Sequence, residues 1–287
     1  MTPVEMLERW LSTRLPPDAA TWLTSAAQRL RAGAADRDLY LLTSLVSRHV
    51  GKGALALTAA ELASAAESCP GWNPRDWTLD QAARVYLLLA STADPDTFTR
   101  RLDRLCSVAD VAELVAFYRG LPLYPDQPRY VMRAAEGTRS NMRVVFEAVA
   151  HYNPYPAQYF AEGQWNQMVL KALFVGSALD PIVGLDARRD PNLARMLCDY
   201  ARERWAASRP VPPELWRCVG PFAAGPALEL VRRLFERGTD VEREAAALAL
   251  RDAKDPEAAR LLESHPALAR KSRQGQLDWR HLTAVRN

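Results

Sequence analysis

The chain has 287 residues, of which 48% are hydrophobic and 25% charged, so it can bury a core as one large domain or two modest ones. Its formal net charge is +3, and its arginines alternate with acidic residues, as in Arg202-Glu203-Arg204, which argues against a nucleic-acid surface and indicates a solvated helical face. No apolar run approaches the roughly 18 residues that cross a bilayer, so we expect no transmembrane segment.

Residues 1–119 form a series of segments whose apolar residues recur with the period of an α-helix. Thr58 and Glu61 have the spacing of a capping box at the start of one such segment. The sequence contains no sustained alternation of apolar and polar residues and no Asn-Gly hairpin turn. Short connections between amphipathic helices indicate antiparallel neighbours, so we expect an all-α protein.

The proline-rich break at residues 120–128 predicts a boundary between lobes. We expect an N-terminal helical lobe over residues 1–125 and a C-terminal helical lobe over residues 126–287, joined as one continuous domain. The tail at residues 223–287 contains helix pairs whose second member is rich in alanine and leucine, which resembles a HEAT-like repeat. Because no strict period runs through the chain, the pattern predicts an irregular α-solenoid of antiparallel helix pairs, HEAT-like toward the C-terminus.

Polar groups in apolar surroundings concentrate at residues 152–216, which are the larger part of a central block at residues 136–216. The run Asn-Pro-Tyr-Pro occupies residues 153–156. Two prolines remove two backbone donors and favour an extended, rigid segment that presents Tyr155, Tyr159 and Phe160. One interpretation makes these aromatic residues the wall of a pocket, and the other makes them core residues of a helix connection.

The helix that we expect from Trp165 is apolar on two adjoining faces, including Leu170 and Phe174, which predicts that it is buried. A narrow polar stripe of Asn166, Gln167 and Lys171 remains. Gln167 and Lys171 stand four residues apart and project together. A lysine on a buried helix needs a carboxylate or a ligand anion unless it reaches solvent. Asp180 and Asp186 are the structural alternatives to a ligand.

The loop at residues 184–190 leads into another helix, for which Asp190 is a natural N-cap and Pro191 the preferred first residue. Asp186 and Arg188 have no such structural role in the sequence, so they bind either a ligand or each other. The candidate ligand-binding residues are therefore Asn153, Tyr155, Trp165, Asn166, Gln167, Lys171, Asp186 and Arg188.

We expect no catalytic residues, no metal ligands and no cofactor. The four histidines are scattered, and no Gly-x-Ser-x-Gly run is present. The four cysteines lack the spacing of a metal or redox motif, so we expect reduced thiols. The N-terminus carries acidic residues and does not have the pattern of a signal peptide, which favours a cytoplasmic protein.

The central block resembles the EboA family. The resemblance is carried by Asn153-Pro154-Tyr155-Pro156, by Trp165-Asn166-Gln167-Met168-Val169-Leu170-Lys171, by Gly184-Leu185-Asp186-Ala187-Arg188 and by Leu197-Cys198-Asp199-Tyr200-Ala201-Arg202-Glu203-Arg204-Trp205. It is dense over residues 136–216 and weaker in the N-terminal third. It implies a bacterial protein whose gene belongs to a cluster for moving or maturing a secondary-metabolite precursor. Neighbouring genes in such clusters encode a membrane prenyltransferase of the UbiA type. The resemblance carries over no catalytic residues.

The leading hypothesis is a non-catalytic accessory protein that binds a small-molecule precursor or a partner protein of the same gene cluster. One alternative is an enzyme with a polar pocket around Lys171, to which His151 also contributes. Another is a pure docking scaffold. A deep pocket lined by Tyr155, Trp165 and Lys171 favours ligand binding or catalysis, whereas a filled core there and an exposed aromatic patch elsewhere favour docking.

Overall fold

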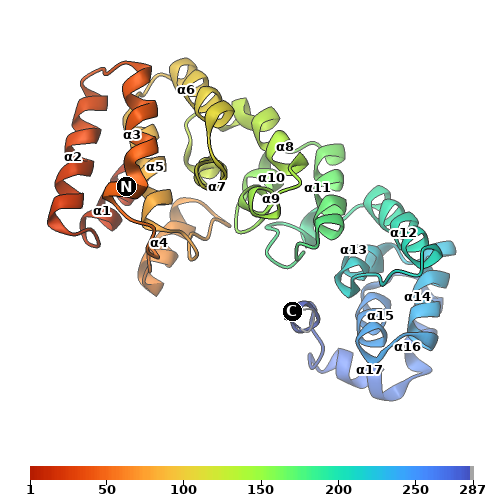
Figure 1. The fold of residues 1–287 in the computed structure, drawn as a ribbon. Helices are drawn as coiled ribbons and strands as arrows, with labels where there is room; N and C mark the ends of the chain where they lie inside the picture. Colours follow the sequence, from red (N-terminus) through yellow and green to blue (C-terminus); the bar gives the residue numbers. More distant parts are fainter. Residues whose placement is uncertain (285–287) are drawn as a thin grey trace. The chain divides into compact units, whose positions relative to one another are not determined.

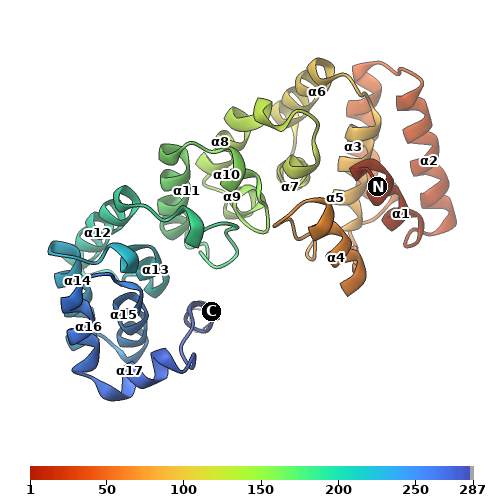
Figure 2. The ribbon, with the colours of Figure 1, turned by 180° about the vertical axis from the view of Figure 1, so that it is seen from behind.

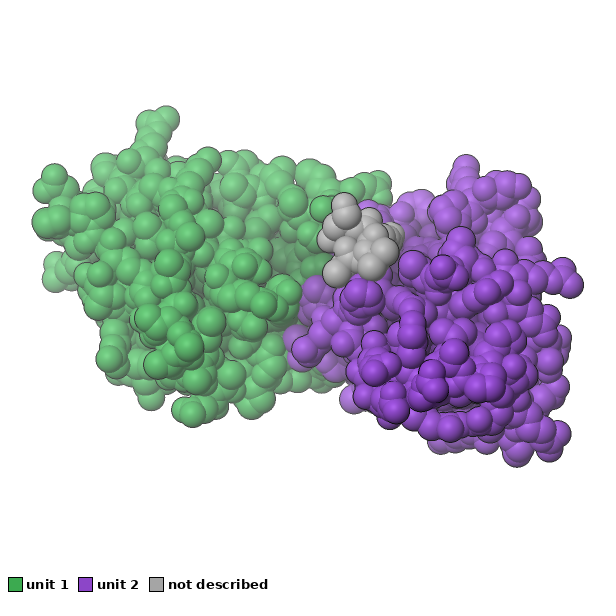
Figure 3. All heavy atoms as spheres, turned by 90° about the horizontal axis from the view of Figure 1, so that it is seen from below, with its two compact units in different colours: residues 1–160 green, residues 161–287 purple. Residues whose placement is uncertain are grey.

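The structure is a computed structural model that describes residues 1–284, and over this range the chain is helical and contains no strand (Figure 1). The predicted all-α class is therefore confirmed. Two compact units divide the chain, one made of residues 1–160 and the other beginning at Ala161 (Figure 3). The lobe boundary near residue 125 and the HEAT-like solenoid arrangement stay predictions.

Ten α-helices make up the described first unit: α1 Pro3–Ser12, α2 Pro17–Arg31, α3 Asp36–His49, α4 Ala59–Ser68, α5 Leu79–Ala90, α6 Pro95–Val108, α7 Val111–Arg119, α8 Val131–Arg139, α9 Arg143–Ala150 and α10 Tyr155–Tyr159. Eight follow in the described part of the second: α11 Glu162–Val175, α12 Pro191–Ala206, α13 Trp216–Val219, α14 Pro226–Arg237, α15 Asp240–Asp252, α16 Pro256–Glu263, α17 Pro266–Arg273 and α18 Trp279–Ala284. Proline occupies the first turn of many of them, including α1, α6 and α12. Backbone N–H groups in the first turn have no acceptor within the helix, so the lack of an N–H in proline costs no hydrogen bond there.

Helix α5 is the centre of the first unit and contacts α1, α2, α3, α6 and α7 (Figures 1 and 2). Nine of its 12 residues are buried, among them Asp80 and Arg84. A helix that is covered on every side in this way is part of the core rather than an amphipathic surface helix. The two charged residues pair with each other across one turn of the helix.

Helix α15 has the same place in the second unit, where it contacts α13, α14, α16 and α17. Residues 245–250 of this helix, which the sequence shows as alanine and leucine, are all buried. Small side chains let the backbones approach closely. At Gly220, an added Cβ atom would lie 2.8 Å from both the Cα atom and the carbonyl oxygen of Ala249. The contact between the segment at Gly220 and α15 therefore requires glycine.

The predicted capping box at the start of α4 is confirmed, and Arg14 extends it. The carboxylate of Glu61 accepts hydrogen bonds from Arg14 Nη2 at 2.5 Å and from the backbone N–H of Thr58 at 2.8 Å. The Arg14 hydrogen bond, supported by Thr58, lowers the pKa of Glu61 from 4.5 to about 2. Since the folded-state pKa is depressed, the stabilisation is complete above about pH 4.5 and is lost as the pH falls toward 2.

We predict that Arg14→Gln lowers the free energy of unfolding by about 1 kcal/mol at neutral pH, a value reduced from the full pKa shift because solvent screens this partly exposed pair. The difference between the variant and the wild type should shrink through the same acid range. Urea unfolding at a series of pH values measures it, and a difference that does not change with pH would contradict the assignment.

Candidate functional site

The predicted ligand-binding residues are distributed over both compact units. Asn153 and Tyr155 belong to the first, and Trp165, Asn166, Gln167, Lys171, Asp186 and Arg188 belong to the second. The two sets of residues are described separately below, each within its own unit.

Asn153 is buried and hydrogen-bonded through both ends of its amide. Its Nδ2 donates to the carbonyls of Tyr118 and Ala148, both at 3.1 Å, and its Oδ1 accepts from the backbone N–H of Tyr155 at 3.0 Å. These bonds join the ends of α7 and α9 to the start of α10. The Asn153 side chain therefore fixes the path of the backbone here.

Tyr155 is fully buried, and its hydroxyl donates to the carbonyl of Gln127 at 2.5 Å. Burial raises the pKa of this phenol well above its usual range. The segment begins the short helix α10, with Pro156 in its first turn. Phe160, at the end of that helix, is also buried. Tyr155 and Phe160 thus fit the interpretation in which these aromatic residues belong to a core.

A small hollow of about 150 Å³ lies beside Asn153 in the first unit. His151 also lines it, as do Arg119, Glu147 and Trp72. Burial, the largest influence on Arg119, lowers the pKa of its guanidinium, while Asp76 and Glu147 act in the opposite direction. The hollow brings acidic and basic groups together in a space suited to only a few water molecules or a small ion.

In the second unit, Trp165 and Asn166 are both buried at the start of α11. Asn166 Nδ2 donates to Asp190 Oδ1 at 3.3 Å, and the same oxygen accepts the N–H of Leu193 at 2.9 Å. Asp190 is therefore the N-cap of α12, with Pro191 as the first residue of the helix, as predicted. The guanidinium of Arg188 lies over the Trp165 ring, 4.6 Å from its centroid.

Three buried polar atoms in this neighbourhood lack a hydrogen-bond partner within the described residues. They are Trp165 Nε1, Asn166 Oδ1 and Asp190 Oδ2. Each such atom costs stability unless water or a ligand satisfies it. The start of α11 thus combines tight packing with unfilled hydrogen-bonding capacity.

Asp186 binds Arg217, a residue that the sequence analysis did not single out. The two oxygens of Asp186 accept from Arg217 Nε at 2.9 Å and Nη2 at 2.7 Å, and Arg217 Nη1 also donates to Asp180 at 3.0 Å. The Arg217 hydrogen bonds hold the pKa of Asp186 below its usual value. Both carboxylates that were structural alternatives for Lys171 therefore contact one arginine, which joins the loop at residues 180–186 to α13.

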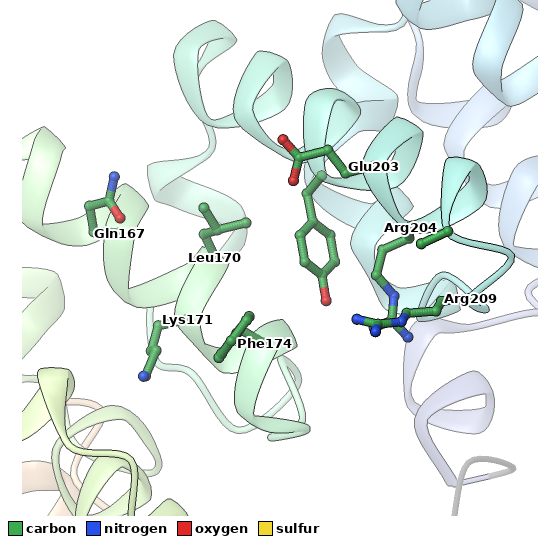
Figure 4. A pocket seen from close by; sticks show the side chains of 9 residues that line it. Gln167, Leu170, Lys171, Phe174, Glu203, Arg204 and Arg209 are labelled. Carbon is green, nitrogen blue, oxygen red and sulfur yellow. The ribbon is translucent and has the colours of Figure 1, made fainter.

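Gln167 and Lys171 line a hollow of about 650 Å³ between α11 and α12 (Figure 4). This volume lies within the range of roughly 300–1,000 Å³ found for small-molecule pockets. The lining from α11 is Gln167, Leu170, Lys171 and Phe174, and the lining from α12 and the turn after it is Tyr200, Glu203, Arg204, Ala207 and Arg209. Among the predicted candidates of this unit, only Gln167 and Lys171 contribute to it.

The prediction that α11 is buried on two adjoining faces is wrong for part of the second face, on which Leu173 is buried but Leu170 and Phe174 are not. Leu170 is only half-buried, and Phe174 is 70% exposed. Both side chains point toward the hollow between α11 and α12 (Figure 4). Sequence period identifies an apolar face, but it does not reveal whether a neighbouring helix covers that face closely. Here Leu170 and Phe174, which form part of that face, line an open pocket.

The turn after α12 fixes the second wall of this hollow. Ser208 has a φ of 54°, its N–H donates to the carbonyl of Trp205 at 3.0 Å, and the N–H of Arg209 donates to the carbonyl of Arg204 at 2.8 Å. This pair of bonds is a Schellman motif. It places Arg204 and Arg209 on adjoining turns of one wall. Helix α11 ends in the same way at Gly176, whose φ is 74°.

The residues from α12 that line this hollow did not appear as candidates in the sequence analysis, which interpreted the charges of this helix as a solvated face. One available signal was spacing, because Tyr200, Glu203, Arg204 and Ala207 recur on a single helical face. The partner of that face was not visible in the sequence. Arg209 lies beyond the helix, where period gives no information.

Comparison with known proteins gives one positive result. No curated protein and no solved structure matches the chain. Within the described residues, no helix is both long enough and apolar enough to cross a membrane. Residues 3–220 match the family model described as "Metabolite traffic protein EboA". Because this match covers well over half of the sequence and includes both walls of the α11–α12 hollow, the chain belongs to the EboA family.

Proposed function

We propose that the chain is a cytoplasmic accessory protein of a bacterial secondary-metabolite pathway and that it binds a small-molecule precursor between α11 and α12. The observation that carries this proposal is the hollow of about 650 Å³ beside Gln167 and Lys171. It has the size of a ligand pocket and a mixed apolar and polar lining. The family description, which names metabolite traffic, supports the same role.

In this proposal the protein holds the precursor without changing it chemically and presents it to other proteins of the same gene cluster. Lys171 and Gln167 fix the orientation of the ligand, and Leu170 and Phe174 contact its apolar part. The half-buried position of Lys171 supports this assignment, since its ammonium group can meet a ligand while its stem packs along α11.

A second candidate function is catalysis, and a different location favours it. The small hollow in the first unit gathers His151, Glu147, Asp76 and Arg119, which are groups that can exchange protons. An enzyme of this kind would use that hollow rather than the surroundings of Lys171. Its size restricts it to a very small substrate or to one protruding group of a larger molecule.

Native mass spectrometry of the protein purified from its source organism tests the leading proposal. We expect a retained small molecule in the wild type and its loss in Lys171→Met, with a change of at most about 1 kcal/mol in the free energy of unfolding because Lys171 is only half-buried. Lys254→Met is the matched control, because Lys254 is an exposed lysine of the same unit outside the pocket lining.

The possible outcomes separate the hypotheses. Retention by the wild type and by Lys254→Met, but not by Lys171→Met, supports binding between α11 and α12. Equal retention by all three proteins overturns the role of Lys171. If the wild-type protein has the mass of the polypeptide alone and another protein co-purifies with it, the ligand-binding proposal is overturned in favour of a docking scaffold.

A further inference from the structure

We infer that the ligand of the α11–α12 hollow is an organic anion, a carboxylate or phosphate group attached to an apolar body. This inference rests on the proposed function and adds the chemical class of the ligand.

The charge of the lining favours an anion. Three cationic residues, Lys171, Arg204 and Arg209, line this hollow, together with one acidic residue, Glu203. A pocket with this excess of positive charge attracts anions and repels cations. Arginine is also suited to carboxylate and phosphate groups, because its planar guanidinium donates two parallel hydrogen bonds.

The two arginines differ in how far the protein already uses them. Arg204 donates from Nε and Nη2 to the carbonyl of Pro210, at 3.0 and 2.8 Å, and so holds the turn after α12 in place. For the exposed Arg209 side chain, the structure records no hydrogen bond or ion pair with any residue in 1–284. Arg204 thus supports the wall, and Arg209 has its full donor set available for an anion.

The apolar part of the lining lies mainly on the other wall. Leu170 and Phe174 of α11 face the hollow (Figure 4), and Phe174 is the most exposed large apolar side chain that the structure describes. The ammonium group of Lys171 lies 5.3 Å from the centroid of the Phe174 ring. An apolar body that covers Phe174 would remove this surface from water and strengthen binding, because burial of apolar surface is favourable.

These features together fit a molecule with one charged end and one apolar end. A neutral apolar ligand would leave the arginine wall without a counter-charge. A cationic ligand would meet three like charges and one opposite charge. The apolar end would lie against Leu170 and Phe174, while the anionic end would lie against Arg209 and the edge of Arg204.

Isothermal titration calorimetry with three probes of equal chain length tests this inference. The probes are octyl phosphate, octanol and octyltrimethylammonium, which carry a negative, a zero and a positive charge. We expect octyl phosphate to bind at least about tenfold more tightly than the other two, and its advantage to shrink as salt is added. Equal affinities, or tighter binding of the cation, would overturn the inference.

Two substitutions with opposite expected signs locate the binding site. Arg209→Gln should weaken octyl phosphate binding about fivefold and leave the affinity for octanol unchanged. Glu203→Gln should strengthen octyl phosphate binding by a similar factor. Both side chains are exposed, so neither change should disturb folding. Arg195→Gln is the matched control, because Arg195 is an exposed arginine of α12 that lies outside the lining and pairs with Asp199.

The result also separates this inference from the proposed function. If native mass spectrometry reveals a retained neutral or cationic molecule that Lys171→Met loses, the proposed function stands and the anion inference is wrong. If no molecule is retained and none of the three probes binds, the proposed function is wrong as well. If octyl phosphate binds but Arg209→Gln and Glu203→Gln leave its affinity unchanged, the anion site is not in this hollow.

Discussion

Trp165→Ala is expected to lower the free energy of unfolding by about 3–5 kcal/mol, the usual range for removing a large aromatic side chain from a core. Trp165 is 1% exposed, and its ring lies beneath the guanidinium of Arg188. Alanine would leave a cavity at the start of α11 and would remove the aromatic face that Arg188 covers. The loss should appear as a lower midpoint in urea with an unchanged slope.

Two further substitutions separate the packing of Trp165 from its polar group. Trp165→Phe removes the buried indole N–H, which has no hydrogen-bond partner among residues 1–284, and should therefore cost far less than alanine. Phe174→Ala, on the same helix but at a side chain that is 70% exposed, should change stability by less than about 1 kcal/mol. If Trp165→Ala melts at the wild-type temperature, the burial of this side chain does not contribute to stability as argued.

The contrast between Trp165 and Phe174 also illustrates how far the sequence predicts this fold. Both residues occur in an apolar pattern with helical period, and both were expected to be buried. Period identifies which residues share a face, but burial depends on how closely the next helix packs against that face. The signals that were confirmed are local ones. Thr58 with Glu61, and Asp190 with Pro191, need only their own neighbours in the sequence to start a helix.

The candidate site was predictable to the same limited extent. Gln167 and Lys171 were identified because a spacing of four residues places two polar side chains on one helical face. Arg209 was not, since its position depends on the turn after α12. The partner of Asp186 was also missed, because Arg217 lies 31 residues further along the chain and no local pattern connects the two. Asn153 was noticed as a polar residue directly before the Pro-Tyr-Pro run, but only the fold reveals that its amide binds backbone groups.

The second large effect is expected at the buried ion pair in the first unit, where Arg84→Met should lower the free energy of unfolding by about 3–5 kcal/mol. Arg84 Nη1 lies 2.6 Å from Asp80 Oδ2, and the two side chains are only 3% and 5% exposed. Arg84 Nη2 also donates to Ser47 Oγ at 2.8 Å. Methionine fills a similar volume, but it leaves the Asp80 carboxylate in the core without its cation.

A comparison with an exposed pair of the same spacing separates burial from simple charge attraction. Arg143 and Glu147 stand four residues apart on α9, with 61% and 27% of their side chains exposed. Arg143→Met should therefore cost less than about 1 kcal/mol, because solvent screens an exposed pair. A similar loss in the two variants would show that burial is not the cause of the Arg84 effect.

The double variant Asp80→Asn with Arg84→Met should recover a large part of the stability lost by Arg84→Met alone. Removing the carboxylate leaves no uncompensated charge in the core, and the Thr78 hydroxyl, which donates to Asp80 Oδ1 at 2.5 Å, can still donate to the asparagine oxygen. A double-mutant cycle in urea therefore predicts strong coupling between the two positions. Additive losses would mean that each residue stabilises α5 through separate contacts, with Arg84 acting through Ser47 and Glu113 rather than as the counter-ion of Asp80.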